Sequence, residues 1–197
     1  MKKMSNWLSQ KSFSKKDEVF TPKILTDLIV QYLPKKAKVL CPFDTENSEF
    51  VLSCKEKKIN VDYGHIKTGQ DFFKLPKKNK YTHIVSNPPF SKKKKVFEHL
   101  FFLGKPFAML MGLPVLNYQE IGDFFYQQQE KGFFLQLLIP DKKVSFDGNT
   151  SSFCTAFFCY NFLKYPIIFR HLSHNNTGKN FVRSRMIQDF DDEGNPI

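Results

Sequence analysis

The tetrapeptide Asn87-Pro88-Pro89-Phe90 brings together residue types that can hold a planar ring bearing an amino group. It follows an apolar, β-branched run at 81–86, which predicts a short buried strand. Two successive prolines restrict φ, remove two backbone donors and keep the preceding residue extended. The turn therefore presents the Asn87 side chain and nearby carbonyl groups as rigid hydrogen-bonding groups, beside the flat face of Phe90. This combination suits a nitrogen heterocycle with an exocyclic amino group.

A strand followed by Asn-Pro-Pro-Phe resembles the catalytic motif of the S-adenosylmethionine-dependent amino-group methyltransferases, above all the adenine N6 DNA methyltransferases. The resemblance implies that Asn87, Pro88, Pro89 and Phe90 bind the target adenine. Asn87 and the Pro88 carbonyl would accept hydrogen bonds from its amino group, and Phe90 would stack on its ring. Taken alone, the four residues also fit a turn that merely ends a strand, but the order of the neighbouring segments favours the family.

Two further segments are similar to the cofactor-binding elements of that family. Phe20-Thr21-Pro22 resembles the segment that precedes the first helix and packs over the methionine part of the cofactor. Asp71-Phe72 resembles a pair whose carboxylate accepts a hydrogen bond from the cofactor's adenine amino group and whose aromatic ring packs on the adenine. The alternatives are packing at a helix start for Phe20 and turn capping for Asp71.

The segment Cys41-Pro42-Phe43-Asp44 follows the predicted first strand and departs from the family pattern, which is acidic-Pro-Phe-x-Gly-x-Gly. Pro42 and Phe43 match, but Cys41 stands at the acidic position and the glycines are absent. In the family these glycines let the backbone approach the cofactor at a helix N-terminus. Asp44 can supply the missing carboxylate from a shifted position. Otherwise cofactor binding is weak or lost.

The other roles in this region have substitute candidates. Asn47 and Ser48 can take the positions of the tight turn and the helix cap. Asp62 is the nearest acidic residue after the predicted second strand and is the candidate for binding the cofactor ribose, although His65 stands where that residue is expected.

The formal net charge of +11 and pI near 9.4 favour a polyanionic partner. Most of the lysines are scattered doublets, but Lys92-Lys93-Lys94-Lys95 directly follows the proposed catalytic turn. We expect Lys92, Lys93, Lys94 and Lys95 to contact nucleic-acid phosphates beside the bound base. The alternative is an exposed first turn of a helix, although four cations there oppose the helix dipole. DNA is the favoured partner and RNA the alternative.

Strand and helix patterns alternate along the chain, which predicts an α/β fold: a Rossmann-like, three-layer, mostly parallel sheet with a C-terminal antiparallel hairpin, as in class I methyltransferases. Helices are expected at 22–33, 48–57, 93–103 and 117–130, and strands at 37–42, 59–63, 81–86, 107–111, 133–139, 152–163 and 166–170.

A chain of 197 residues is long enough for one domain with a proper core. We expect a flexible basic arm at 1–17, a methyltransferase-like domain at 18–170 and a polar, acidic tail at 171–197. No separate target-recognition domain fits into this length. In this short form the sequence also resembles a group of small phage and prophage methyltransferases with a similar Cys-Pro-Phe-Asp loop.

The remaining composition places the protein in the cytoplasm and away from membranes. No apolar run is long enough to span a bilayer, and no secretory signal is recognisable at the start. The four cysteines show no metal-ligand spacing, so we expect free thiols in a reducing compartment and no metal site.

The expected function is methyl transfer from S-adenosylmethionine to the exocyclic amino group of adenine in DNA, with the base flipped out or single-stranded. The same chemistry on RNA is one alternative. Another is a methyltransferase-like pseudoenzyme that binds nucleic acid or a host defence protein, which the missing glycines favour. Methylation of a protein glutamine uses a similar turn, but usually with Tyr at the position of Phe90.

Overall fold

The computed structural model describes residues 21–146 and 152–172 of the chain, and for Lys67, Phe90 and Ser152 it describes the backbone only. The predicted basic arm at 1–17, Phe20 and the greater part of the predicted tail lie outside the described residues. At the other end, Leu172 is only 3% exposed and its amide donates to Asp141 Oδ1. The packed domain therefore reaches at least residue 172.

Within the described residues, seven strands form one sheet in the order β2-β1-β3-β4-β8-β5-β9. These strands are β1 (Lys38–Cys41), β2 (Asn60–Tyr63), β3 (His83–Ser86), β4 (Phe107–Gly112), β5 (Gln136–Pro140), β8 (Thr155–Tyr160) and β9 (Ile167–Arg170). The pairs β1–β2, β1–β3, β3–β4 and β5–β9 are parallel. Strand β8 runs antiparallel to both β4 and β5. The predicted mostly parallel sheet with an antiparallel hairpin is confirmed.

The order of the first three strands creates a topological switch point. The chain runs from β1 to β2 on one side and then crosses to place β3 on the other side of β1. Val39 pairs with His83 and Leu40 with Ile84, so the two neighbouring strands run parallel and end at the same edge of the sheet. In open α/β sheets, ligands bind in the crevice outside the carboxyl ends of strands at such a switch point. This topology predicts where a site should lie before any side chain is considered.

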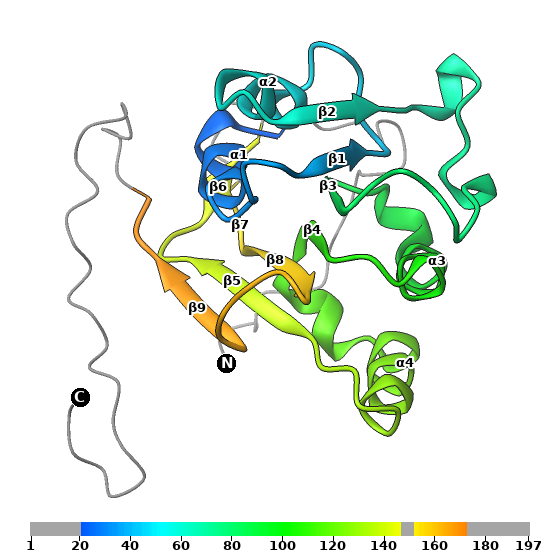
Figure 1. The fold of residues 1–197 in the computed structure, drawn as a ribbon. Helices are drawn as coiled ribbons and strands as arrows, with labels where there is room; N and C mark the ends of the chain where they lie inside the picture. Colours follow the sequence, from blue (N-terminus) through cyan, green and yellow to red (C-terminus); the bar gives the residue numbers. More distant parts are fainter. Residues whose placement is uncertain (1–20, 147–151, 173–197) are drawn as a thin grey trace, which may run out of the picture.

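Helices cover both faces of the sheet and make three layers (Figure 1). They are α1 (Lys23–Val30), α2 (Glu49–Glu56), α3 (Lys93–Leu103) and α4 (Gln119–Gln129). Helices α1 and α2 pack on one face, where Leu25, Ile29 and Phe50 join a largely aliphatic core. Helices α3 and α4 pack on the other, where Phe97 and Phe124 join a phenylalanine-rich core. Many of the phenylalanine residues therefore pack at the interface between the sheet and helices α3 and α4.

Helix α3 begins and ends where the sequence predicts. Its buried residues are Val96, Phe97, Leu100 and Leu103, which recur at helical spacing. It ends at Gly104, whose φ of 64° is left-handed and whose amide donates to the Leu100 carbonyl at 3.1 Å. Glycine adopts this conformation without strain, so it is a common terminator.

Helix α1 is shorter than predicted. It ends at Val30 rather than near residue 33, and the next turn tightens because Tyr32 and Leu33 donate to the carbonyls of Ile29 and Val30. The residue before a proline is disfavoured in the α conformation, which keeps Leu33 out of the helix ahead of Pro34.

The C-terminal strands also differ from expectation in their bounds. The strand predicted at 133–139 starts only at Gln136, because the turn after α4 continues until the Phe133 amide donates to the Gln128 carbonyl. The strand predicted at 152–163 is divided: β7 (Ser152–Phe153) pairs with β6 (Val144–Ser145) outside the main sheet, and β8 follows in the sheet. Short 3-10 turns fill the connections, of which η2 (Ile66–Thr68), η3 (Phe72–Lys74) and η4 (Phe90–Lys92) matter for the site.

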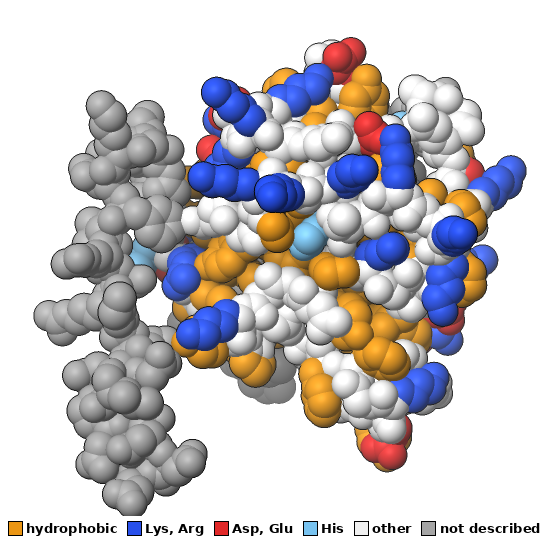
Figure 2. Space-filling model, in the orientation of Figure 1, with side chains coloured by type: hydrophobic (Ala, Val, Ile, Leu, Met, Phe, Trp, Pro, Cys, Tyr) orange, Lys and Arg blue, Asp and Glu red, His pale blue; other side chains and the backbone are white. Residues whose placement is uncertain are grey.

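Lys and Arg side chains are spread over the face shown in Figure 2 and alternate with apolar patches. In the part of the chain that the structure describes, no helix is both long and apolar enough to cross a bilayer. All four cysteines are free thiols, as expected.

Candidate functional site

A cavity of about 430 Å³ lies at the topological switch point, outside the carboxyl ends of β1 and β3. Its lining residues come from the loop after β1, from the connection between β2 and β3, and from the corner after β3, together with Thr21. Ligand pockets for molecules of nucleotide size typically have volumes of about 300–1,000 Å³. The cavity is therefore large enough for a nucleoside-type ligand.

Ten of the predicted site residues line this cavity: Thr21, Pro42, Phe43, Asp44, Asp71, Phe72, Asn87, Pro88, Pro89 and Lys92. Segments that are distant in the sequence thus meet in one place. Pro22, Cys41, Asp62, Lys93, Lys94 and Lys95 are not among the lining residues.

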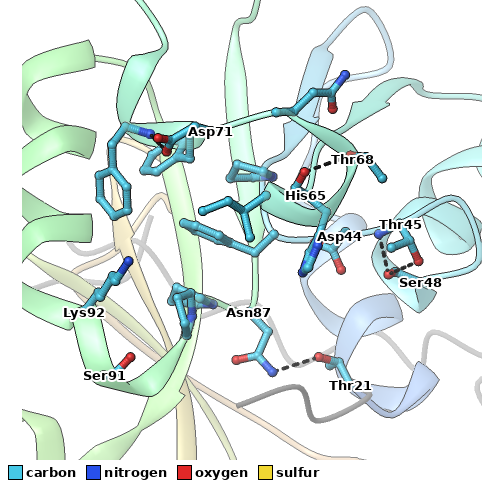
Figure 3. A pocket seen from close by; sticks show the side chains of 18 of the residues that line it. Thr21, Asp44, Thr45, Ser48, His65, Thr68, Asp71, Asn87, Ser91 and Lys92 are labelled. Atoms are coloured by element: carbon cyan, nitrogen blue, oxygen red, sulfur yellow. Dashed lines mark hydrogen bonds between the residues drawn. The ribbon is translucent and has the colours of Figure 1, made fainter. Parts of the chain in front are cut away.

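Asn87 and Thr21 meet at one end of the cavity. Asn87 Nδ2 donates a hydrogen bond to Thr21 Oγ1 at 3.2 Å, and Figure 3 shows the two side chains pointing toward one another. A carboxamide carries its donor and its acceptor on different arms. The bond to Thr21 therefore turns the acceptor oxygen of Asn87 away from Thr21 and restricts the rotation of the side chain.

Asp44 is a buried carboxyl group between the loop after β1 and the corner after β3. It is only 7% exposed, and Oδ2 accepts a hydrogen bond from Ser86 Oγ. Burial raises the pKa of Asp44 to about 6, although hydrogen bonds from Ser86 and Ser48 act in the opposite direction. The carboxylate form is thus poorly solvated, and a cationic or hydrogen-bond-donating ligand group beside it would stabilise that form.

The loop after β1 closes without the glycines of the family pattern. The Thr45 amide donates to Ser48 Oγ at 2.9 Å, and the Ser48 amide donates to the Thr45 carbonyl at 3.0 Å. Among described residues other than glycine, positive φ occurs at Lys58 and Asn161, so none lies in this loop. The loop therefore has no conformation that requires glycine. Ser48 occupies the cap position of α2, as expected, but its hydroxyl bonds the loop instead of the helix.

Asp71 lies on the wall away from Asn87 (Figure 3), and its neighbour Phe72 also lines the cavity. Asp71 Oδ1 accepts from the Phe73 amide at 3.0 Å and caps η3, which is the capping role considered for it. One carboxylate can accept further hydrogen bonds at its other oxygen. Phe72 packs edge to face on Phe43, with ring centroids 5.0 Å apart. Aromatic rings and a carboxylate thus lie together on the side away from Asn87.

Asp62 and His65, the two candidates for the ribose-binding position, lie in different places. Asp62 Oδ2 lies 2.5 Å from Lys80 Nζ and accepts from the Tyr81 hydroxyl at 3.1 Å, outside the cavity lining. The hydrogen bond from Lys80 lowers the pKa of Asp62. His65, by contrast, lines the cavity (Figure 3). His65 is therefore better placed than Asp62 to contact a ligand.

Cys41 and Pro22, which were also predicted to bind the cofactor, lie outside the cavity lining and have structural roles. Cys41 is fully buried in the core under α1 and α2, and a hydrogen bond with Cys54 together with burial raises the pKa of its thiol. Pro22 precedes α1 with extended backbone, and its carbonyl accepts from the Leu25 amide. Neither side chain is placed to contact a ligand in the cavity.

The four consecutive lysines point to different surroundings. Lys92 lines the cavity, and its Nζ lies 5.9 Å from the centre of the Phe73 ring. Lys93 Nζ lies over the Tyr118 ring at 5.1 Å. Lys94 Nζ is 4.0 Å from Glu98 Oε1, and Lys95 lines a second hollow on the surface. Lys92 and Lys95 thus share the second hollow, whereas Lys93 and Lys94 face other partners.

Sequence reasoning missed several lining residues, of which Ile66, Thr68 and Gln70 lie beside His65 in the wall contributed by the β2–β3 connection. No motif marks them because a short irregular connection has no periodic pattern. Ser86 does not line the cavity but anchors Asp44, and it could have been found, since a hydroxyl at the end of a buried strand needs a partner.

The fold has matches among solved structures. A protein assigned as the modification subunit of a type I restriction enzyme from Vibrio vulnificus is 11% identical, with a TM-score of 0.56, over 94% of this chain and 59% of that chain. A chain from a type I restriction-modification system is 12% identical, with a TM-score of 0.52, over 92% of this chain and 48% of that one. A protein assigned as a class I S-adenosylmethionine-dependent methyltransferase from Listeria monocytogenes is 10% identical, with a TM-score of 0.49, over 81% and 67% of the two chains.

The chain shares the three-layer α/β fold of the two restriction-system proteins. At these identities the likeness concerns the fold alone. The chain spans about half to three fifths of the length of the two restriction-system proteins. No protein-family model matches the sequence, and no curated protein matches it either.

Proposed function

We propose that this protein transfers a methyl group from S-adenosylmethionine to the exocyclic amino group of adenine in DNA. The observation that carries the proposal is the meeting of Asn87, held by Thr21, with Asp44, Asp71 and Phe72 in one cavity at the switch point of a methyltransferase fold. The restriction-system proteins that share the fold are consistent with a DNA substrate.

The cavity walls have the chemistry that the cofactor needs. The adenosine and methionine parts of S-adenosylmethionine present amino, hydroxyl and ammonium donors. Asp44 and Asp71 supply carboxylate acceptors at separate places on the cavity wall. Phe43 and Phe72 supply apolar rings for the adenine, and Ile66, exposed at the same wall, adds an aliphatic face. In this proposal Asp44 takes the place of the acidic residue absent at Cys41.

Asn87 performs the positioning step. Its Oδ1 and the Pro88 carbonyl accept hydrogen bonds from the amino group of the target base, which aims the nitrogen lone pair at the methyl carbon. When bound, S-adenosylmethionine would supply an activated methyl group, which the nitrogen held by Asn87 and the Pro88 carbonyl would accept in exchange for a proton. The nitrogen releases a proton to water. Most of the rate enhancement then comes from orientation rather than from acid–base chemistry.

The target adenine must leave the duplex or already be single-stranded to reach the cavity. Phe90 would stack on it, as the motif implies, and Lys92 at the cavity wall would contact a flanking phosphate. RNA offers the same base, so it is the second candidate substrate.

A pseudoenzyme is the remaining alternative, and the glycine-poor loop was its main support. The loop backbone has no residue in the positive-φ region, so the missing glycines do not distort it. The buried Asp44 and the cavity beside Asn87 also favour an enzyme.

Calorimetric titration with S-adenosylmethionine and methyl incorporation into DNA and RNA oligonucleotides test the proposal. The wild type should bind the cofactor and label adenine-containing DNA. Asn87→Ala should lower turnover by about 100-fold or more, because a positioned acceptor is lost, while cofactor binding persists. Asn60→Ala, an exposed amide at the start of β2, is the control and should behave as wild type. Silent calorimetry, or wild-type turnover in Asn87→Ala, contradicts the proposal.

A further inference from the structure

A second hollow adjoins the cavity on the side of α3. It is lined by Phe73, Lys92, Lys95, Glu98, His99 and Phe102, with a volume of about 520 Å³. Phe73 and Lys92 also line the cavity, so the two depressions share a wall. In Figure 1 the strands β1 and β2 point toward the side where both the β2–β3 connection and α3 lie. The hollow is thus an extension of the site across the outer surface.

Aromatic rings connect the hollow with the cavity in an unbroken series. Phe72 contacts Phe73 with centroids 5.5 Å apart, and Phe73 contacts His99 at 5.9 Å. His99 stacks on Phe102 at 5.6 Å, with 28° between the ring planes. Burial lowers the pKa of His99, which keeps its ring neutral near neutral pH. The series leads from a ring that lines the cavity to a ring on the surface.

Phe102 is the outer end of this series and is 52% exposed. It stands three residues after His99 and seven after Lys95, so the three side chains share one face of α3. A core-filling role does not explain Phe102, because the buried residues of α3 are Val96, Phe97, Leu100 and Leu103. An exposed ring backed by a second ring is a ready platform for stacking.

The charges of the hollow favour an anion. Lys92 and Lys95 contribute two ammonium groups. The single carboxylate, Glu98, lies 4.0 Å from Lys94 Nζ, which offsets its charge. Alternating cations and exposed aromatic rings are the features by which proteins bind single-stranded nucleic acid, with phosphates on the cations and bases on the rings.

We propose that this hollow is a subsite for the nucleotide next to the target base in a single strand: its base stacks on Phe102 and its phosphate is neutralised by Lys92 and Lys95. The inference rests on the proposed function, because the cavity that it adjoins would hold the target adenine. It adds that the substrate is recognised as a strand of at least two nucleotides rather than as an isolated base.

Binding of fluorescein-labelled single-stranded oligonucleotides, measured by fluorescence anisotropy with S-adenosylhomocysteine present, tests the subsite. The oligonucleotides contain one adenine among thymines, and in two further versions an abasic residue replaces the neighbour on one side or the other. Phe102→Ala should weaken binding of the intact strand by about 5- to 100-fold. One abasic version should show a similar loss with the wild type and little further loss with Phe102→Ala. Phe102→Trp should restore binding.

Tyr126→Ala is the matched control, because Tyr126 is a 63% exposed ring on α4 outside the hollow, and it should bind as wild type. Matching RNA oligonucleotides distinguish the two kinds of strand. Wild-type affinity in Phe102→Ala, an equal abasic penalty in both proteins, or no binding of either strand by the wild type overturns the subsite.

Methyl incorporation, measured in parallel, separates the two proposals. If the wild type methylates adenine and Phe102→Ala binds normally, only the subsite is wrong. Suppose instead that the abasic substitution weakens binding to the wild type but not to Phe102→Ala, and that the wild type transfers no methyl group. The subsite is then supported and the proposed function is wrong.

Discussion

The loop after β1 and the corner after β3 face each other across the same cavity but are built in different ways. The corner is stiffened by covalent restriction, since Pro88 and Pro89 follow Asn87 directly. The loop is held by hydrogen bonds: Ser48 closes it onto Thr45, and Asp44 joins it to Ser86. The backbone of the corner is therefore rigid by covalent restriction, whereas the loop depends on hydrogen bonds, of which the one from Ser86 to Asp44 is a tertiary contact.

This difference explains why the corner after β3 has a recognisable sequence motif and the loop after β1 does not. A proline-locked turn requires particular residue types at particular positions. A hydrogen-bonded loop can be closed by several combinations of polar side chains, and here it forms without glycine. The loop also carries a cost, because Asp44 is a buried carboxyl group, and binding of a suitable ligand would offset that cost.

Asp44→Asn should have the largest effect on stability, a gain of about 3 kcal/mol in the free energy of unfolding at neutral pH. The pKa of Asp44 rises from 3.8 to about 6 on folding, so the folded state holds this proton more tightly than the unfolded state. The resulting stability is present below the unfolded pKa and is lost as the pH rises through 6. Urea unfolding between pH 4 and pH 8 should show the two proteins converging at the acid end.

The same variant should bind S-adenosylmethionine more weakly, because an amide carries no charge. Asp62→Asn should change stability in the opposite direction. The pKa of Asp62 is lowered on folding, so removing its carboxylate should lower the free energy of unfolding at neutral pH. An Asp44→Asn protein no more stable than wild type at pH 8 would show that the loop carries no electrostatic cost.

Ser86→Ala should break the link between the two regions. It removes the hydroxyl that donates to buried Asp44, at a cost of about 2 kcal/mol in the free energy of unfolding. Cofactor affinity should also fall, because Asp44 loses its anchor. Ser53→Ala is a matched control: Ser53 is equally buried and donates to Asp27 at 2.8 Å, outside the cavity. It should lose stability but keep cofactor affinity, as calorimetry can check. Equal binding losses in both variants would argue against a specific link.

Thr21→Val should lower turnover about tenfold, the equivalent of about 1.4 kcal/mol, by freeing the Asn87 carboxamide to rotate. The dissociation constant of S-adenosylmethionine should stay near the wild-type value, and Thr21→Ser should restore turnover. Thr82→Val, at an exposed position outside the cavity, is the control. Weaker cofactor binding with unchanged turnover would instead assign Thr21 to the cofactor, as the family resemblance implies.

Lys92→Gln should have the smallest effect, a few-fold loss of affinity for single-stranded DNA and a salt-dependence slope reduced by about one. Lys94→Gln, four residues before its partner Glu98, should change neither. Binding isotherms at several salt concentrations measure both slopes. Equal reductions for the two lysines would mean that the run acts as one diffuse patch.

Sequence patterns predicted most elements of the fold because each depends on local periodicity. The bounds of α3 were right, since apolar spacing and Gly104 mark them. The strand bounds near β5 and β8 were less accurate, because strand ends are set by pairing partners that the local sequence does not show. For the site, the segment containing Asn87 and the loop containing Asp44 were identified in advance, and both line the cavity.

The residue types alone determined that the chain forms an α/β domain and that a rigid Asn-Pro-Pro turn ends one of its strands, because both follow from interactions between near neighbours in the chain. Only the tertiary structure decided that Thr21 holds Asn87, that Ser86 holds Asp44, and that His65 rather than Asp62 lines the cavity. Those contacts join segments separated by many residues, and strand order, which brings β1 beside β3, sets which of them meet.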